Sequence, residues 1–159
     1  MVPMGRGWNC VVPVHIGGVR FRITCDTGAA RNLVRQSFVE QLRRNPKTKD
    51  ALIRRGRCDR VINCTGICKG MSTASIEYCS EIELLWKSVS SDGSKPTPDA
   101  SRRVMFSELP EGSDALLLGY PLLAEWGYHT YKDDDDVLWV EFKSLGVTLV
   151  AENPPALGD

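Results

Sequence analysis

A short strand of alternating apolar residues runs into a carboxylate in the stretch Phe21-Arg22-Ile23-Thr24-Cys25-Asp26-Thr27-Gly28-Ala29. A carboxylate at the end of a buried strand is costly to desolvate unless another group pairs with it or uses it. Gly28 lets the backbone turn sharply beside Asp26, and Ala29 leaves the space in front of the acid open. The Thr27 hydroxyl can hold the loop rigid through hydrogen bonds. The stretch therefore predicts an acid fixed at the floor of a cleft, although Asp26-Thr27-Gly28 alone is more typical of a simple turn.

Composition limits the kinds of protein that the chain can be. Its 159 residues suit one domain, and its formal net charge of zero gives no reason to expect nucleic acid or a membrane as partner. No apolar run approaches the roughly 20 residues that span a bilayer. The N-terminus lacks the apolar core of a secretory signal, so we expect a cytoplasmic protein whose six cysteines are free thiols.

Alternating apolar residues predict several strands. Residues 10–25 read as a β-hairpin whose turn is Gly17-Gly18, because glycine tolerates positive φ at both central positions. Further strands are expected over 32–35, 74–86, from Val104, over Val137–Phe142 and over Val147–Val150, and Ser37 is expected to cap a helix over 38–44.

The expected organisation is a single folded domain over residues 10–150. An N-terminal segment of residues 1–9 precedes it, and a C-terminal tail of residues 151–159 follows it. Two stretches lengthen the domain: a basic insertion at 43–60 and an exposed loop at 88–103 that is rich in Ser, Pro, Gly and Asp.

The basic insertion and the cysteines allow other interpretations. The run of arginines and lysines over 43–60 suits a patch for nucleic acid or an acidic partner, but it lacks interleaved aromatic residues, which favours a solvated insertion. Cys58, Cys64, Cys68 and Cys79 are spaced unlike any standard zinc knuckle, and no histidine lies near them in the sequence.

Two further segments accompany the Asp26 loop. Glycines four residues apart in Gly66-Ile67-Cys68-Lys69-Gly70 predict a hairpin whose tip can approach a ligand closely. The apolar run Ala115-Leu116-Leu117-Leu118, bounded by Gly119, predicts a fully buried strand, and Pro121 suits the first turn of a short helix after it.

In this order, the three segments resemble the retroviral-type aspartic proteases, the retropepsins. The resemblance covers roughly residues 10–150. Within the family, the sequence is most similar to retrotransposon proteases and to ubiquitin-linked eukaryotic proteins that carry such a domain. The resemblance implies an all-β fold with one or two short helices, closed into a β-barrel, with one lobe of the acid-protease fold per subunit.

The resemblance also implies residue roles. Asp26 would be catalytic, with Thr27, Gly28 and Ala29 supporting its loop. The flap that covers the substrate would comprise Thr65, Gly66, Ile67, Cys68, Lys69 and Gly70, and the strand behind the site would contribute Leu117, Leu118 and Gly119. No metal or organic cofactor is implied.

Peptide hydrolysis by this chemistry needs two carboxylates that share a proton, and the chain has a single Asp-[Ser/Thr]-Gly. The second acid must then come from a second copy, which predicts a homodimeric aspartic endopeptidase with a polypeptide substrate. The resemblance implies in addition that the domain comes from a retroelement polyprotein.

The chain departs from the family pattern in three respects. It is longer, its terminal strands cannot be matched residue by residue, and Gly119 is followed by Tyr120-Pro121 rather than by the arginine of many viral members. The family's arginine-mediated dimer contacts therefore cannot be carried over. A catalytically inactive dimerisation or peptide-binding module of the same fold stays open as an alternative, as does a zinc or nucleic-acid module.

Overall fold

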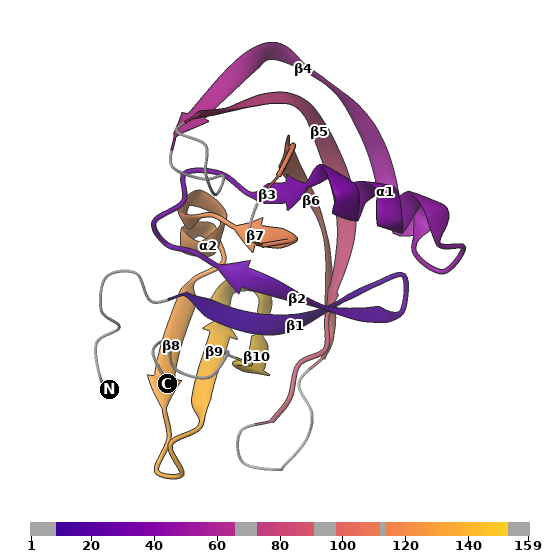
Figure 1. The fold of residues 1–159 in the computed structure, drawn as a ribbon. Helices are drawn as coiled ribbons and strands as arrows, with labels where there is room; N and C mark the ends of the chain where they lie inside the picture. Colours follow the sequence, from indigo (N-terminus) through magenta and orange to yellow (C-terminus); the bar gives the residue numbers. More distant parts are fainter. Residues whose placement is uncertain (1–8, 66–72, 91–97, 112–113, 153–159) are drawn as a thin grey trace, which may run out of the picture.

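The computed structural model describes residues 9–65, 73–90, 98–111 and 114–152, and the side chains of 59–65 and 73–74 are not described (Figure 1). In chain order its elements are β1 (Cys10–Ile16), β2 (Val19–Cys25), β3 (Leu33–Arg35), α1 (Gln36–Arg44), the 3-10 turn η1 (Lys49–Ala51), β4 (Leu52–Thr65), β5 (Thr73–Trp86), β6 (Ala100–Leu109), β7 (Leu116–Leu118), α2 (Tyr120–Glu125), β8 (Tyr128–Lys132), β9 (Leu138–Phe142), the 3-10 turn η2 (Lys143–Leu145) and β10 (Val147–Val150).

Six strands close into a barrel. The hydrogen-bonded order β1-β2-β7-β3-β6-β5 returns to its start because His15 of β1 pairs with Leu85 of β5. Closure leaves these strands without free edges. The predicted mainly-β barrel with only short helices is confirmed.

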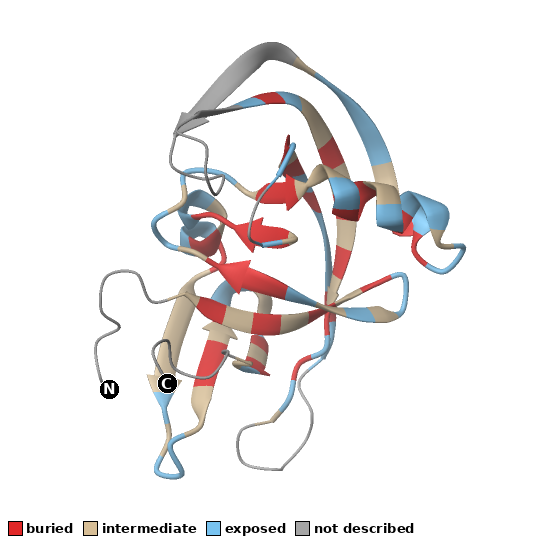
Figure 2. Cartoon of the chain, viewed as in Figure 1, coloured by how far each residue is buried: buried red, intermediate tan, exposed pale blue. Residues whose placement is uncertain are grey.

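The N-terminal hairpin follows the prediction from the sequence. β1 alternates between buried and half-buried residues, and Gly17 and Gly18 make the turn with φ of 59° and 83°. β2 alternates only at first; its last three residues are all buried because β1 and β7 flank it (Figure 2). β7 is buried throughout and runs parallel to β2, with Cys25 opposite Leu118. This pairing brings the end of β2 beside Gly119.

A long hairpin of β4 and β5 extends from the barrel as an arm at the top of Figure 1. β5 also belongs to the barrel, whereas β4 pairs with β5 alone. The basic stretch 43–60 supplies the end of α1, η1 and the first part of β4. β6 begins at Ala100, so the end of the expected loop 88–103 is strand, paired with the last residues of β5.

A second sheet, of β8, β9 and β10, packs beside the barrel. Three aromatic rings join the two parts: Trp86 of β5, Trp126 after α2 and Phe142 of β9, whose centroids lie 5.0 to 6.0 Å apart with steeply inclined planes. Edge-to-face contacts of this kind add to the free energy gained by burying the rings. Within the described ranges, no helix has the length and apolar character needed to cross a membrane.

Candidate active site

Asp26 stands where β2 ends, in a loop held by backbone hydrogen bonds. Its N–H donates to the Leu118 carbonyl of β7 (2.9 Å), and its own carbonyl accepts from the Ala29 N–H (3.2 Å). Its carboxylate oxygen Oδ1 accepts from the Gly28 N–H at 2.8 Å. No other hydrogen bond within the described part of the chain reaches this carboxylate, and Thr27 and Gly28 are exposed. The Asp26 backbone and one carboxylate oxygen are therefore held by hydrogen bonds, while the acid itself is half-buried beside exposed loop residues.

The loop that follows Asp26 is fastened to the segment after β7. The Tyr120 N–H donates to the Ala29 carbonyl (2.8 Å), and the Gly119 N–H donates to the side-chain oxygen of Asn32 (2.9 Å). A Cβ on Gly119 would lie 2.5 Å from the Arg31 carbonyl oxygen, closer than any real contact. A side chain at position 119 would push the loop away, so glycine is required here by space alone.

Gly28 has a similar but milder constraint. A Cβ at this position would lie 3.3 Å from Asp26 Oδ1. A larger residue would crowd the carboxylate that the Gly28 N–H holds. The glycine therefore permits both the turn and the hydrogen bond.

The core directly behind Asp26 carries neutral polar groups. Cys10 and Cys25 are opposite one another in β1 and β2 and are fully buried, and burial raises the pKa of both thiols. Burial likewise raises the pKa of Tyr128, which hydrogen-bonds Cys10. These groups stay protonated at neutral pH, so they add no charge behind the acid.

The residues expected in the flap are only partly described. β4 ends at Thr65, whose backbone pairs with Thr73 of β5. Gly66, Ile67, Cys68, Lys69 and Gly70 lie outside the described residues. Their role as a flap stays a prediction.

The residues expected behind the site are Leu117, Leu118 and Gly119, and their role there stays a prediction. Leu118 is fully buried and Leu117 nearly so, in β7, and Gly119 starts α2 as its N-cap. Together with the Asp26 loop they form one hydrogen-bonded unit made from two segments some 90 residues apart in the chain.

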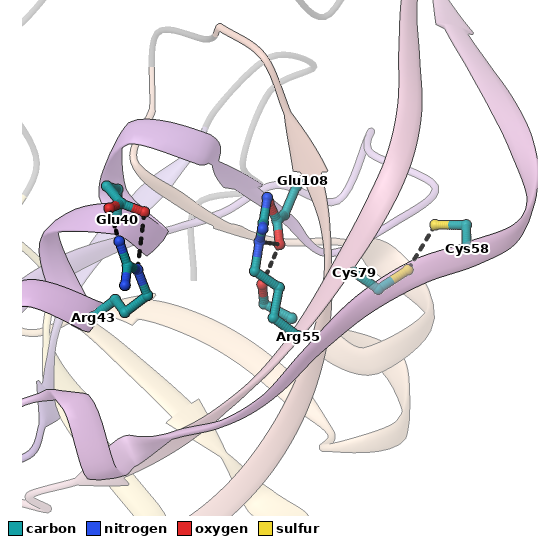
Figure 3. Close-up of polar contacts among 7 residues, drawn as sticks. Glu40, Arg43, Arg55, Cys58, Cys79 and Glu108 are labelled. Carbon is teal, nitrogen blue, oxygen red and sulfur yellow. Dashed lines mark hydrogen bonds and ion pairs between the residues drawn. The ribbon is translucent and has the colours of Figure 1, made fainter.

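A pocket of about 1050 Å³ opens beside this unit. It is lined by Ala30, Arg31 and Asn32, by residues 54–58 of β4, and by parts of β5, β6 and α2. Behind the lining residue Arg55, the fully buried Glu108 carboxylate accepts hydrogen bonds from two nitrogens of the Arg55 guanidinium, with N–O distances of 2.9 to 3.1 Å, and one from Ser80 (Figure 3). The pair ties β4 to β6 across β5.

Three residues of this region were not singled out from the sequence: Asn32, Arg31 and Glu108. An amide a few residues after Asp-Thr-Gly is a signal that a backbone N–H nearby needs an acceptor. The positions of Arg31 and Glu108 depend on which strands become neighbours, and no pattern within one segment reveals that.

The fold corresponds to that of retropepsin-like aspartic protease domains. The chain is similar to the retroviral protease-like domain of Ddi1 from Leishmania major, with a TM-score of 0.52, 15% identity, and 94% of this chain and 98% of that chain covered. It is also similar to the EIAV protease complexed with the inhibitor HBY-793 (TM-score 0.43, 15% identity, 79% and 95% covered). A third neighbour is a retropepsin-like aspartic protease from Rickettsia conorii (TM-score 0.41, 12% identity, 92% and 84% covered).

No protein-family model matches the chain, and no curated protein matches it. The retropepsin-like acid-protease fold that the sequence predicts is thus confirmed by structure, while the activity is a separate question because fold alone does not define function.

Proposed function

We propose that this protein is an aspartic endopeptidase that works as a homodimer, with Asp26 of each subunit forming the catalytic pair. The observation that carries the proposal is the fixed Asp26 carboxylate: one oxygen accepts from Gly28, and the loop around it is exposed. A half-buried acid with an open face suits a site that is completed by a second copy.

Two carboxylates on the dimer axis would share one proton. Since like charges a few ångströms apart cannot both ionise, one pKa of the pair falls and the other rises, and the titration belongs to the pair. The ionised acid takes a proton from water, which attacks the scissile carbonyl, and the protonated acid donates its proton to the carbonyl oxygen. Collapse of the tetrahedral intermediate then breaks the C–N bond as the amine leaves with a proton.

The rest of the site would bind the substrate and hold the loops. An extended peptide would add as a strand to backbone groups of the Asp26 loop and of the hairpin over Thr65–Met71. Thr27, which is exposed, would hydrogen-bond across the axis to the other subunit's loop. An origin in a retroelement polyprotein and a cytoplasmic location are part of this proposal and rest on the sequence alone.

The decisive variant is Asp26→Asn, which keeps the shape of the side chain and removes its proton chemistry. We expect cleavage of a mixed peptide library at mildly acidic pH to fall at least about 1000-fold, within the range that acid–base groups contribute. Asp99→Asn, an exposed acid ahead of β6, is the matched control and should leave the rate unchanged.

Circular dichroism and sedimentation should give the same fold and mass for both variants. Cleavage by Asp26→Asn at the rate of the unaltered protein would exclude this mechanism. A dimer of the unaltered protein that binds peptides and cleaves none would identify a binding module instead.

A further inference from the structure

The pocket beside the Asp26 loop has an unusual balance of charge. Its lining includes four arginines, namely Arg31, Arg54, Arg55 and Arg57, and a single acid, Glu125 of α2. A pocket with this composition attracts anions unless neighbouring carboxylates neutralise its arginines.

Two of the four arginines are neutralised from outside the lining. Arg55 forms its two-pronged pair with the buried Glu108, and Arg54 pairs with Glu81 of β5 at 3.3 Å. Their charges are committed to holding β4 against its neighbours. These two paired arginines therefore contribute little positive potential that could attract a ligand.

The other two arginines keep their charge available. Arg57 lies over the Tyr78 ring at 5.5 Å, and Tyr78 first and then the Glu77 carboxylate raise the pKa of Arg57, but among the described residues no carboxylate forms an ion pair with it. Arg31 is exposed, and it has no ion pair or hydrogen bond within the described residues. Burial is the main cause that raises the pKa of the Cys79 thiol, and the Arg31 charge partly opposes it, so this guanidinium acts across the pocket on β5.

Arg31 is also close to the chemistry. It follows Gly28 by three residues, and its backbone is packed against Gly119. A fully extended chain covers about 3.3 Å per residue, so five residues from Asp26 span at most about 17 Å. An extended peptide bound at Asp26 therefore has side chains within reach of this pocket, and those two to four residues from the scissile bond are the candidates.

We propose that the pocket is a subsite for an acidic side chain of the peptide substrate, with Arg31 as its main determinant and Arg57 as its second. The inference rests on the proposed function and adds the substrate class. Arginine is suited to this role because its planar guanidinium binds a carboxylate through two parallel hydrogen bonds. Glu125 at the rim would repel acids that approach from the α2 side.

The test uses pairs of peptides that differ only by Glu or Gln at each position two to four residues from a cleaved bond. With the unaltered protein, we expect kcat/KM to be about tenfold higher for Glu than for Gln at one of these positions, as a charge-assisted pair would give. Arg31→Ala should reduce that ratio to near one, and Arg31→Glu should reverse it, so that the Gln peptide is cleaved better than the Glu peptide. Arg102→Ala, on the exposed part of β6 outside the pocket, should preserve the ratio.

A binding arm separates this proposal from the proposed function. Fluorescently labelled Glu and Gln peptides are titrated into Asp26→Asn, which is expected not to cleave them, and again into the double variant that adds Arg31→Ala. Tighter binding of the Glu peptide that disappears in the double variant supports the subsite even if no peptide is ever cleaved. Equal affinity for Glu and Gln peptides, or stronger competition by an oligodeoxythymidine than by the Glu peptide, would overturn it.

Discussion

At the scale of single residues, Gly119 is the position beside the Asp26 loop where the fold has no room for a side chain. Its φ is −90°, which any residue adopts, so the requirement for glycine is steric. In Gly119→Ala the new methyl group meets the Arg31 backbone, which cannot move away as a flexible side chain can. We expect a loss of about 2–3 kcal/mol in the free energy of unfolding, the cost of overpacking against a fixed neighbour. Thermal unfolding should then begin about 5–10 °C earlier.

Gly56→Ala is the control for this substitution. A Cβ on Gly56 meets nothing within 4 Å, and alanine costs less backbone entropy than glycine in a strand. Its unfolding temperature should be unchanged or slightly higher. Equal unfolding temperatures for the two variants would contradict the prediction, because they would mean that the Arg31 backbone moves aside at little cost.

The same residues show what a sequence can and cannot predict at this scale. Asp26, Thr27 and Gly28 are recognisable because an acid, a hydroxyl and a glycine are adjacent and their chemistry is local. Asn32 accepts a hydrogen bond from Gly119, which is 87 positions away in the chain. Glu108 binds Ser80 and Arg55, which are 28 and 53 positions away. Those partners are known only once β3, β6 and β7 are neighbours.

At the scale of elements, the β4–β5 hairpin carries a pair of thiols near its middle. Cys58 and Cys79 face each other across the two strands with their sulfurs 2.8 Å apart (Figure 3). A disulfide needs about 2.05 Å, so a small approach of the strands suffices. We predict that oxidised glutathione converts this pair to a disulfide: the Cys58 thiolate displaces one glutathione, and the Cys79 thiolate then displaces the second.

The pKa of the Cys79 thiol determines how this reaction depends on pH. Burial, and then the hydrogen bond with Cys58, raises it to about 11. Below that value the thiolate fraction rises tenfold per pH unit, so the second step should accelerate between neutral pH and pH 10. Peptide mapping by mass spectrometry should find Cys58 joined to Cys79.

Two comparisons complete this test. In Cys79→Ser the mixed disulfide of Cys58 with glutathione should persist, because the resolving thiol is gone. Cys10 and Cys25, which are fully buried, should stay reduced in the folded protein. Pairing of Cys58 with any cysteine other than Cys79 in the unaltered protein would contradict this prediction.

Elements also differ in how well their sequences predict them. Strands with a clear period of two, such as β1 and β5, are found in place. The helix starts earlier than expected: α1 begins at Gln36 directly after β3. Arg35 takes the N-cap position without a capping side-chain hydrogen bond, and its Nε donates to the Ser37 hydroxyl instead (2.9 Å). The predicted cap at Ser37 is wrong because β3 is drawn to the wall of the barrel, where the Arg35 N–H donates to the Ala115 carbonyl (3.0 Å).

β8 was missed altogether. All but its last residue are half-buried, because it lies at the edge of the small sheet, so it has no alternation to detect. Its content of Tyr and Thr was the available signal, together with the acidic turn that joins it to β9.

At the scale of the whole molecule, the question is whether one chain is half of an enzyme. The single Asp-Thr-Gly and the exposed face of its loop lead us to expect that no subunit hydrolyses peptides alone. Mixing subunits tests this directly. If dimers form at random, adding an equal amount of Asp26→Asn to the unaltered protein leaves about one quarter of the dimers with both acids, so total activity should fall to about one half.

A ninefold excess of Asp26→Asn should lower total activity to about one tenth by the same statistics. The same excess of heat-unfolded Asp26→Asn, which cannot form dimers with the unaltered protein, should have no effect. The unaltered protein alone should lose activity per subunit when it is diluted below the dissociation constant of the dimer. The concentration at which half of this activity is lost gives that constant approximately. Total activity that is unaffected by folded Asp26→Asn would mean that each chain works by itself, and the pairing of acids across a two-fold axis would have to be abandoned.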